Sequence, residues 1–125
     1  MSVRFLSKEW ADEFNTRAAA DNAAFKGKKG TFMNVIPDAP GGEVRYALRF
    51  ADDTATITIG DVADPEVTMS QSYETGAAIN RGELDGQKAF MQGKVKLTGK
   101  MIKMMQLRGA LTQISKVLAS IDTDY

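Results

Sequence analysis

Apolar and polar residues alternate along residues 43–50 and again along residues 54–60. Because successive side chains on a strand point to opposite faces, each segment has one apolar and one polar face. A sheet with one buried and one solvated face is typical of antiparallel strands. We therefore predict two antiparallel strands whose apolar face is covered by helices. The apolar positions are Val44, Tyr46, Leu48, Phe50, Ala55, Ile57 and Ile59, and the opposite face carries Arg45 and Arg49.

Three further strands are predicted at residues 31–37, 66–71 and 94–98. The first is rich in β-forming residues and ends at Pro37, since proline cannot donate to a strand ladder. The other two are shorter, and their inward positions are Val67, Met69, Val95 and Leu97. The sheet is thus predicted to have five strands.

Apolar residues at helical spacing predict a first helix over residues 8–26 and a last helix over residues 100–121. Ser7 is a suitable N-cap for the first helix, because its hydroxyl oxygen can accept from an unpaired backbone N–H. Gly109 interrupts the last pattern. We expect a break or kink there, since glycine inside a helix costs about 1 kcal/mol relative to alanine.

Two shorter helices are predicted between the last two strands, over residues 73–80 and 85–93. Together with the five strands they predict an α+β fold, in which helices cover one face of a five-stranded, mostly antiparallel sheet. The length of 125 residues suits one domain over residues 1–125.

The chain contains neither cysteine nor histidine. This excludes disulfides, thiolate nucleophiles, the usual zinc sites and acid–base chemistry by imidazole, and we expect neither a metal nor a cofactor. The opening MSVRFLSKEW has no long apolar stretch followed by a small-residue cleavage site, and no run of eighteen apolar residues occurs. We expect a cytoplasmic protein.

Charge is unevenly distributed although the formal net charge is zero. Residues 38–85 hold ten acidic and three basic residues, a balance of −7, whereas residues 86–121 hold seven basic residues and no acid, a balance of +7. Such segregation favours a basic face for an anionic partner. We expect transient contact with anionic membranes through Lys94, Lys96, Lys100 and Lys103.

Four of the seven methionines fall within residues 90–105, interleaved with lysines. At the start of the last helix, Met101, Ile102, Met104 and Met105 point in nearly every direction around the axis. A helix that is apolar all round must be buried on several sides or face a cavity. Methionine adapts well to flexible ligands, but it also fills irregular gaps in cores, so both interpretations stay open.

Catalysis and nucleic-acid binding are not indicated. Carboxylates such as Glu74, Glu83 and Asp85 have no spacing typical of a catalytic pair, and we expect no enzyme. The basic segment offers Phe90 as its only aromatic residue, so a platform for stacking bases is missing.

Residues 89–108, AFMQGKVKLTGKMIKMMQLR, resemble the signature region of the sterol carrier protein type 2 family. In that family a run of the type Ala-Phe-Phe-Gln-Gly-Lys-Leu-Lys-Ile-Thr-Gly precedes a methionine-rich helix. The preceding EVTMSQSYETGAAINRGELDGQKAF is similar to the strand and two helices of the family. FLSKEWADEFN resembles the start of bacterial single-domain members, so the likeness covers nearly the whole chain.

The resemblance implies a hydrophobic tunnel between sheet and helices that binds fatty acids, fatty acyl-CoA, sterols or phospholipids. It also implies that Phe90 is buried. The expected lining is Ile79, Phe90, Met91, Leu97, Met101, Met104, Met105 and Leu107. Lys100, Lys103 or Arg108 would meet a carboxylate, a phosphate or an anionic membrane.

The chain departs from the family pattern at two places. Met91 replaces the second aromatic residue of the signature, which softens the expected wall. Gln106, Leu107 and Arg108 stand where many members have Lys-Leu-Gln, which leaves the headgroup preference open. The chain ends in DTDY rather than in a peroxisomal tripeptide, which favours a bacterial, cytoplasmic carrier.

A second function is an accessory module of the same fold. Its exposed apolar helix would dock a partner protein or a second copy of the chain, or it would present a lipid-soluble intermediate to a biosynthetic enzyme. A carrier must be hollow, whereas a docking module need not be.

Overall fold

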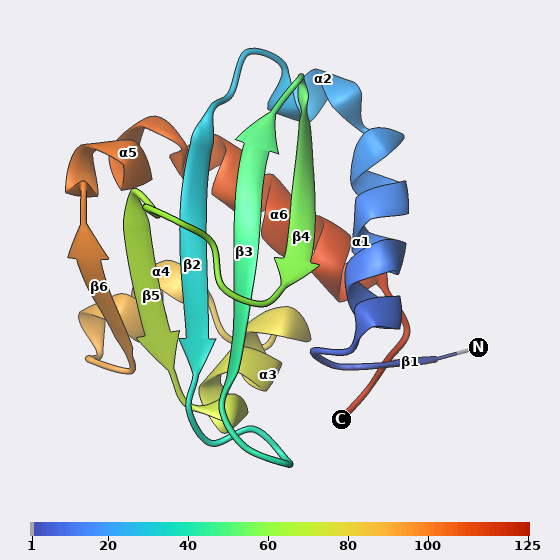
Figure 1. The fold of residues 1–125 in the computed structure, drawn as a ribbon, viewed down its shortest axis with the longest axis vertical. Coiled ribbons are helices and arrows are strands. Elements are labelled where there is room, and N and C mark those ends of the chain that lie inside the picture. The colour runs from blue at the N-terminus through green and yellow to red at the C-terminus, as the bar shows by residue number, and fades with distance from the viewer. Residues whose placement is uncertain (1) are drawn as a thin grey trace.

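The computed structural model describes residues 2–125, apart from the side chain of Asn22. Helices cover one face of a five-stranded sheet (Figure 1). The strands of this sheet are β2 (Gly30–Ile36), β3 (Val44–Ala51), β4 (Thr54–Ile59), β5 (Val67–Gln71) and β6 (Val95–Gly99). The helices are α1 (Lys8–Ala19), α2 (Asn22–Phe25), α3 (Tyr73–Asn80), α4 (Gly86–Met91), α5 (Met101–Gln106) and α6 (Arg108–Ser120). The predicted α+β class is confirmed.

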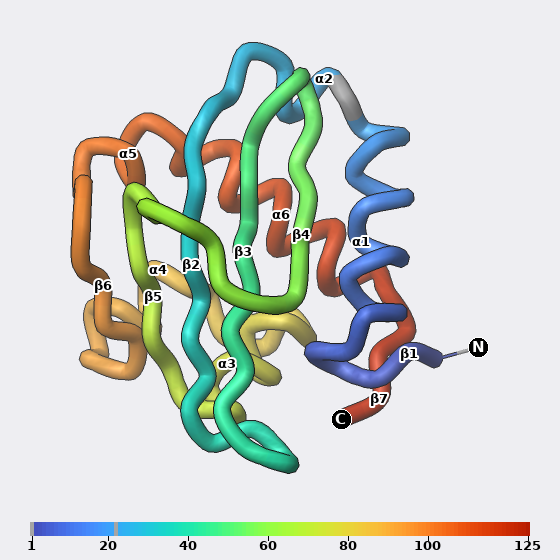
Figure 2. The backbone as a smooth tube through the Cα atoms, in the orientation of Figure 1, coloured from blue at the N-terminus to red at the C-terminus, as the bar shows by residue number. Residues whose placement is uncertain are grey.

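The strands lie in the order β4-β3-β2-β5-β6. Neighbouring strands are antiparallel except for β2 and β5, which are parallel. Figures 1 and 2 show the cause: after β4 the chain crosses β3 and β2 on the face opposite the helices before it enters β5. The sheet is therefore mostly antiparallel, as predicted. The pattern within a strand does not predict the parallel pair, because alternation carries no information about a crossover.

The apolar core lies between the inner face of the sheet and helices α1 and α6. Trp10 and Phe14 of α1 are fully buried, and the Trp10 ring meets the Tyr46 ring edge-on with 5.3 Å between centroids. Of the predicted inward positions, Tyr46, Leu48, Phe50, Ala55 and Ile57 are buried and Val44 is half-buried. Ile59 was predicted inward but is exposed, because it is the last residue of the edge strand β4.

Helix α1 protects the free edge of the sheet at β4. The Asn15 side chain donates from Nδ2 to the Ile57 carbonyl at 3.0 Å, and its Oδ1 accepts from the Ile57 N–H at 2.6 Å. The carboxamide therefore pairs both backbone groups of one edge residue, much as a neighbouring strand would. An edge strand covered in this way offers fewer unpaired groups to other chains.

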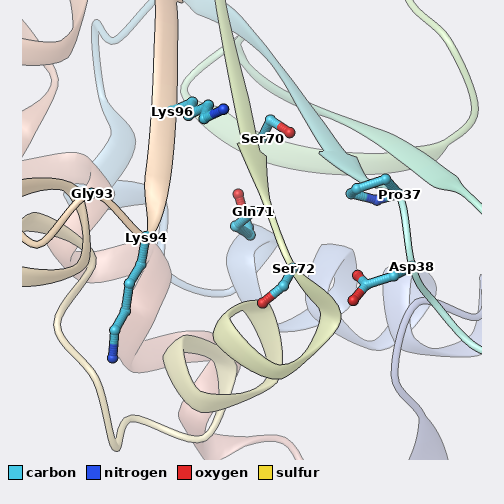
Figure 3. A pocket seen from close by; sticks show the side chains of 8 residues that line it. All are labelled: Pro37, Asp38, Ser70, Gln71, Ser72, Gly93, Lys94 and Lys96. Atoms are coloured by element: carbon cyan, nitrogen blue, oxygen red, sulfur yellow. The ribbon is translucent and has the colours of Figure 1, made fainter.

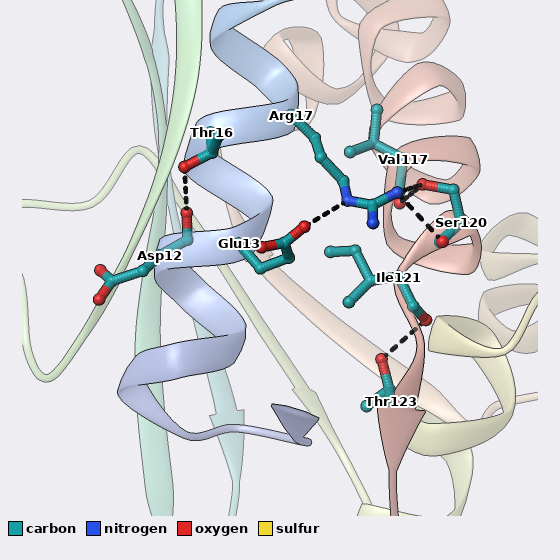
Figure 4. Close-up of polar contacts among 8 residues, drawn as sticks. All are labelled: Asp12, Glu13, Thr16, Arg17, Val117, Ser120, Ile121 and Thr123. Atoms are coloured by element: carbon teal, nitrogen blue, oxygen red, sulfur yellow. Dashed lines mark hydrogen bonds and ion pairs between the residues drawn. The ribbon is translucent and has the colours of Figure 1, made fainter. Parts of the chain in front are cut away.

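Polar contacts join α1 to the end of α6 (Figure 4). Arg17 Nε donates to Glu13 Oε1 at 2.8 Å, and Arg17 Nη1 donates to the Ser120 carbonyl and hydroxyl oxygens, each at 3.1 Å. The Ser120 carbonyl needs such a partner because the last carbonyls of a helix lack intrahelical donors. Beyond α6, β7 (Thr123–Asp124) pairs in parallel with β1 (Val3–Arg4). Strands of two residues carry no periodicity that would predict them.

Both long helices predicted from the sequence are broken into two. The break in the last one lies at Leu107, with φ −102° and ψ 11°, and not at Gly109, which lies inside α6. The Leu107 side chain is buried against Gly30, where an added Cβ would stand 2.8 Å from Leu107 Cδ1. A tertiary contact thus sets the break, and the low helix propensity of glycine does not.

Candidate functional site

The exposed apolar side chains of the described residues are concentrated on α4 and α5. Five of the seven large apolar residues that are exposed belong to these two helices. They are Phe90 (48% exposed), Met91 (83%), Met101 (39%), Ile102 (62%) and Met105 (78%), and we name them the α4–α5 surface. None of the residues of α5 is buried, and Ala89 is the one buried residue of α4.

The eight residues predicted to line a cavity fall into two groups. Leu97 and Met104 are half-buried against the core, Leu107 is buried and Ile79 is half-buried on α3. Phe90, Met91, Met101 and Met105 belong to the α4–α5 surface. The expectation that Phe90 is buried is wrong, because the adjacent Ala89 takes the inward position on this short helix. The cavity itself stays a prediction.

The inner face of the sheet is covered less tightly toward β6. Strand register places Tyr46, Asn34, Met69 and Leu97 in one row across β3, β2, β5 and β6. Tyr46 and Asn34 are buried, whereas Met69 and Leu97 are half-buried. Burial also raises the pKa of the Tyr46 hydroxyl well above its usual range, so the group stays neutral. The half-covered end of the row lies next to α4 and α5.

Two of the three cations predicted to meet a headgroup already contact other residues. Lys103 Nζ lies 3.6 Å from Glu66 Oε2 and donates to the Lys29 carbonyl at 3.3 Å. Arg108 Nη2 donates to Gln87 Oε1 at 3.0 Å. Lys100 is exposed, and its backbone N–H donates to the Glu66 carbonyl at 2.8 Å. The Lys100 side chain is therefore the most available of the three.

A hollow of about 330 Å³ lies at the end of the sheet where β5 finishes and β6 begins (Figure 3). We call it the β5–β6 hollow. Its lining is Pro37, Asp38, Ser70, Gln71, Ser72, Gly93, Lys94 and Lys96. A second hollow of about 270 Å³ lies beside the N-terminal segment and Tyr73. None of the eight predicted lining residues contributes to either hollow.

Three polar side chains are buried in the interior of the described chain: Asn34, Gln71 and Asn80. They lie outside the set of residues predicted to line a cavity. A signal was available for two of them, because Asn34 and Gln71 continue the inward alternation of Phe32 and Met69 on their strands. Asn80 follows Gly76 by one helical turn on α3, and no pattern in the sequence marks it as buried.

The carboxylates considered for catalysis have other contacts. Asp85 caps α4, where its Oδ1 accepts from the Gln87 N–H at 2.7 Å. Glu83 Oε1 lies 3.0 Å from Arg81 Nε, and Glu74 is exposed in the first turn of α3. These contacts are typical of helix termini and solvated surface.

No helix within residues 2–125 is both long enough and apolar enough to cross a bilayer.

The fold matches a known architecture. A crystal structure of sterol carrier protein 2 superposes with a TM-score of 0.77 over 94% of this chain and 99% of that chain. The two sequences are 17% identical, so this likeness concerns the fold.

Sequence relatives point the same way. Non-specific lipid-transfer protein-like 1 of Caenorhabditis elegans is 29% identical over 109 residues, which are 87% of this chain and 92% of that protein. Sterol carrier protein 2 of Gallus gallus is 27% identical over 88 residues, 70% of this chain but 16% of that protein. The model of the SCP-2 sterol transfer family matches residues 11–112. The chain belongs to the SCP-2 sterol transfer family.

Proposed function

We propose that residues 1–125 form one non-catalytic domain that carries lipid in the cytoplasm. The ligand is a fatty acid, a fatty acyl-CoA, a sterol-like lipid or a phospholipid, and its apolar part lies between β5–β6 and helices α3 to α5. The α4–α5 surface supports this proposal most directly. The family match supports a lipid-transfer role. The exposed apolar side chains of α4 and α5 beside the half-covered part of the sheet support this end of the sheet as the place of the ligand.

Helices α4 and α5 have six residues each, so they can change position at low cost. The half-buried Leu97 and Met104 give a bound chain an apolar floor, and rotation of α5 brings Met101 or Met105 over it. Burial of about fifteen methylenes at ~0.8 kcal/mol each contributes on the order of 12 kcal/mol. Loss of about half of this to ordering leaves about 6 kcal/mol, which corresponds to a dissociation constant of roughly tens of micromolar and allows release.

Anionic membranes are the proposed source and destination of the lipid. Lys94, Lys96 and Lys100 are exposed beside the α4–α5 surface, and each lysine near such a surface contributes about 1 kcal/mol. Lys103 contributes less because of its contact with Glu66. Sedimentation with vesicles tests this step: binding should rise with anionic lipid content, and equal binding to neutral and anionic vesicles would contradict it.

Lipid binding is tested by titration with a fluorescent fatty acid and by mass spectrometry of lipids that co-purify under native conditions. Met105→Glu should weaken binding at least tenfold and leave the melting temperature unchanged, since Met105 is 78% exposed. Ile59→Glu is the matched control, because Ile59 is an exposed apolar residue at the opposite edge of the sheet. If the wild type binds no acyl chain, sterol or acyl-CoA, the carrier function is wrong.

The second candidate function is an accessory module of the same fold. The α4–α5 surface would then dock a partner protein or a second copy of the chain, or present a lipid-soluble intermediate to an enzyme. The number of exposed apolar residues on α4 and α5 favours this candidate. A protein that purifies without lipid and elutes as a homodimer that Met105→Glu dissociates would support it.

A further inference from the structure

The two edge strands of the five-stranded sheet differ in how their outward backbone groups are paired. On β4 the Gly60 N–H donates to the Arg45 carbonyl at 2.8 Å. Because antiparallel residues alternate between facing their partner strand and facing away from it, this bond makes Ile57 an outward residue. Asn15 pairs both the N–H and the carbonyl of Ile57. The β4 edge is therefore closed at its middle.

The edge at β6 is open at the equivalent positions. The Lys100 N–H donates to the Glu66 carbonyl at 2.8 Å, so the even-numbered residues of β6 face β5 and the odd-numbered residues face away. The outward N–H and carbonyl groups of Val95 and Leu97 have no hydrogen-bond partner in the part of the chain that the structure describes. β6 is the last strand of the sheet and lies outermost in Figure 1. We call this row of backbone groups the β6 edge.

Lysines set which strands can pair with the β6 edge. Lys94 and Lys96 are exposed on the face of β6 that points away from the helices, and neither forms an ion pair among the described residues. Two copies of the chain paired through β6 would bring these lysines onto one face, where like charges across a strand pair are destabilising. The β6 edge therefore rejects a second copy but accepts a strand of opposite charge.

The two faces of β6 define the side-chain pattern that a partner needs. Lys94, Lys96 and Thr98 are exposed on the outer face, whereas on the inner face Val95 is buried and Leu97 is half-buried. An added strand places its own side chains alternately beside these two faces. Acidic residues beside the lysines contribute roughly 0.2–1 kcal/mol each. Apolar residues on the other face extend the half-covered apolar row of the sheet.

We infer that the β6 edge binds an extended segment of a partner protein in which acidic and apolar residues alternate. The segment adds a strand to the sheet, pairs its backbone with Val95 and Leu97, and places carboxylates beside Lys94 and Lys96. This interaction goes beyond the carrier function and does not depend on it. It also differs from docking through the α4–α5 surface, because main-chain hydrogen bonds hold the partner.

A synthetic peptide of alternating glutamate and valine, about six residues long like an average strand and with blocked ends, tests the inference. Titration of the full chain, followed by NMR, should show binding at peptide concentrations up to about 1 mM. Amide hydrogen exchange at Val95 and Leu97 should slow at least about fivefold near saturation. Exchange at Lys96 and Thr98 should change little, because their N–H groups already face β5. The absence of binding, or equal changes at all four amides, would overturn the inference.

Backbone methylation of the peptide separates strand pairing from charge. In an extended peptide the N–H groups of the glutamates point to one side and those of the valines to the other. N-methylation of one of these two sets should abolish binding, whereas N-methylation of the other set should leave it unchanged. The two methylated peptides carry the same charge. Equal binding by both would reduce the contact to electrostatic attraction and contradict strand addition.

Lys96→Glu tests the charge pattern from the side of the protein. It should weaken binding of the glutamate peptide about three- to tenfold and strengthen binding of a peptide of alternating lysine and valine. Lys116→Glu is the matched control, because it makes the same change at an exposed position of α6 and should alter neither affinity.

An anionic membrane would attract the same lysines but has no strand to pair with the β6 edge. If the glutamate peptide does not bind and Lys96→Glu weakens only the binding to anionic vesicles, these lysines serve a membrane contact and the inference is overturned. The carrier function is unaffected by that result, since it is decided by the binding of a fluorescent fatty acid.

Discussion

The two ends of the sheet are built from similar alternating strands but are closed to different degrees. At the β4 end, α1 places Trp10 and Phe14 against the sheet, both fully buried. At the β6 end, α4 and α5 contribute a single buried residue between them, Ala89. The first end can stabilise the fold, whereas the second leaves apolar side chains available for a ligand or a surface.

The difference follows from the residues and from the lengths of the helices. α1 has 12 residues and presents rigid aromatic rings, which fill space at little entropic cost. α4 and α5 have six residues each and carry four methionines with one phenylalanine and one isoleucine as their large apolar residues. Methionine adapts to several packings and specifies none of them strongly. A region that must accept and release a lipid needs that property.

Phe14→Ala gives the largest expected effect on this comparison. A fully buried phenylalanine replaced by alanine should lower the free energy of unfolding by about 3–5 kcal/mol. Met105→Ala, at the other end, should change it by no more than about 0.5 kcal/mol. Urea denaturation measures both. Equal losses would show that the two ends contribute alike to stability.

Asn15→Ala tests how the packed end protects its edge strand. Both backbone groups of Ile57 would lose their partners, and we expect a loss of about 1–3 kcal/mol in the free energy of unfolding, together with increased aggregation. Thr16→Ala is the control, because the Thr16 hydroxyl donates to the Asp12 carbonyl of its own helix at an exposed site. If Asn15→Ala were as stable as Thr16→Ala, the contact of α1 with β4 would not protect the edge strand.

Asp85→Ala removes the N-cap of α4, whose Oδ1 accepts from the Gln87 N–H at 2.7 Å and the Lys88 N–H at 3.4 Å. Such a cap contributes about 1 kcal/mol. If the β6 end opens on its own, amide hydrogen exchange should become faster in α4 and remain unchanged in β3, with little change in global stability. Faster exchange throughout the sheet would instead make the two ends one cooperative unit.

Glu66→Gln gives the smallest expected effect. The Lys103–Glu66 pair is about three-quarters buried on both sides, at 27% and 25% side-chain exposure, and its loss should cost no more than about 1 kcal/mol. Release of Lys103 should raise binding to anionic vesicles by at most about fivefold, since one lysine contributes about 1 kcal/mol near such a surface. Lys103→Gln should lower it. A fall in vesicle binding with Glu66→Gln would place this lysine outside the membrane contact.

Much of the fold could be predicted because its signals are local. The alternation at residues 43–50 and 54–60 defines β3 and β4 within a residue or two. One face of these strands packs against the core and the other faces water, so the residue types alternate. Ser7 caps α1 as predicted, since its hydroxyl oxygen accepts from the Trp10 N–H, and a cap of this kind depends only on residues about three positions apart. The residues of the candidate site were harder to predict, because the burial of a side chain depends on which helices and strands pack against it. Phe90 and Met104 share a stretch of sequence, yet one is exposed and the other packs against the core.

The sequence by itself determined the five strands of the main sheet, most of their inward positions, the family and the segregation of basic and apolar residues into residues 86–121. Those properties follow from periodicity, composition and local motifs. Only the tertiary structure decided that β5 runs parallel to β2, that the last helix turns at Leu107 to reach Gly30, and that Gln71 and Asn80 bury oxygens without partners. Each of these depends on contacts between segments far apart in the chain, and the residue types at any one of the positions do not reveal such contacts.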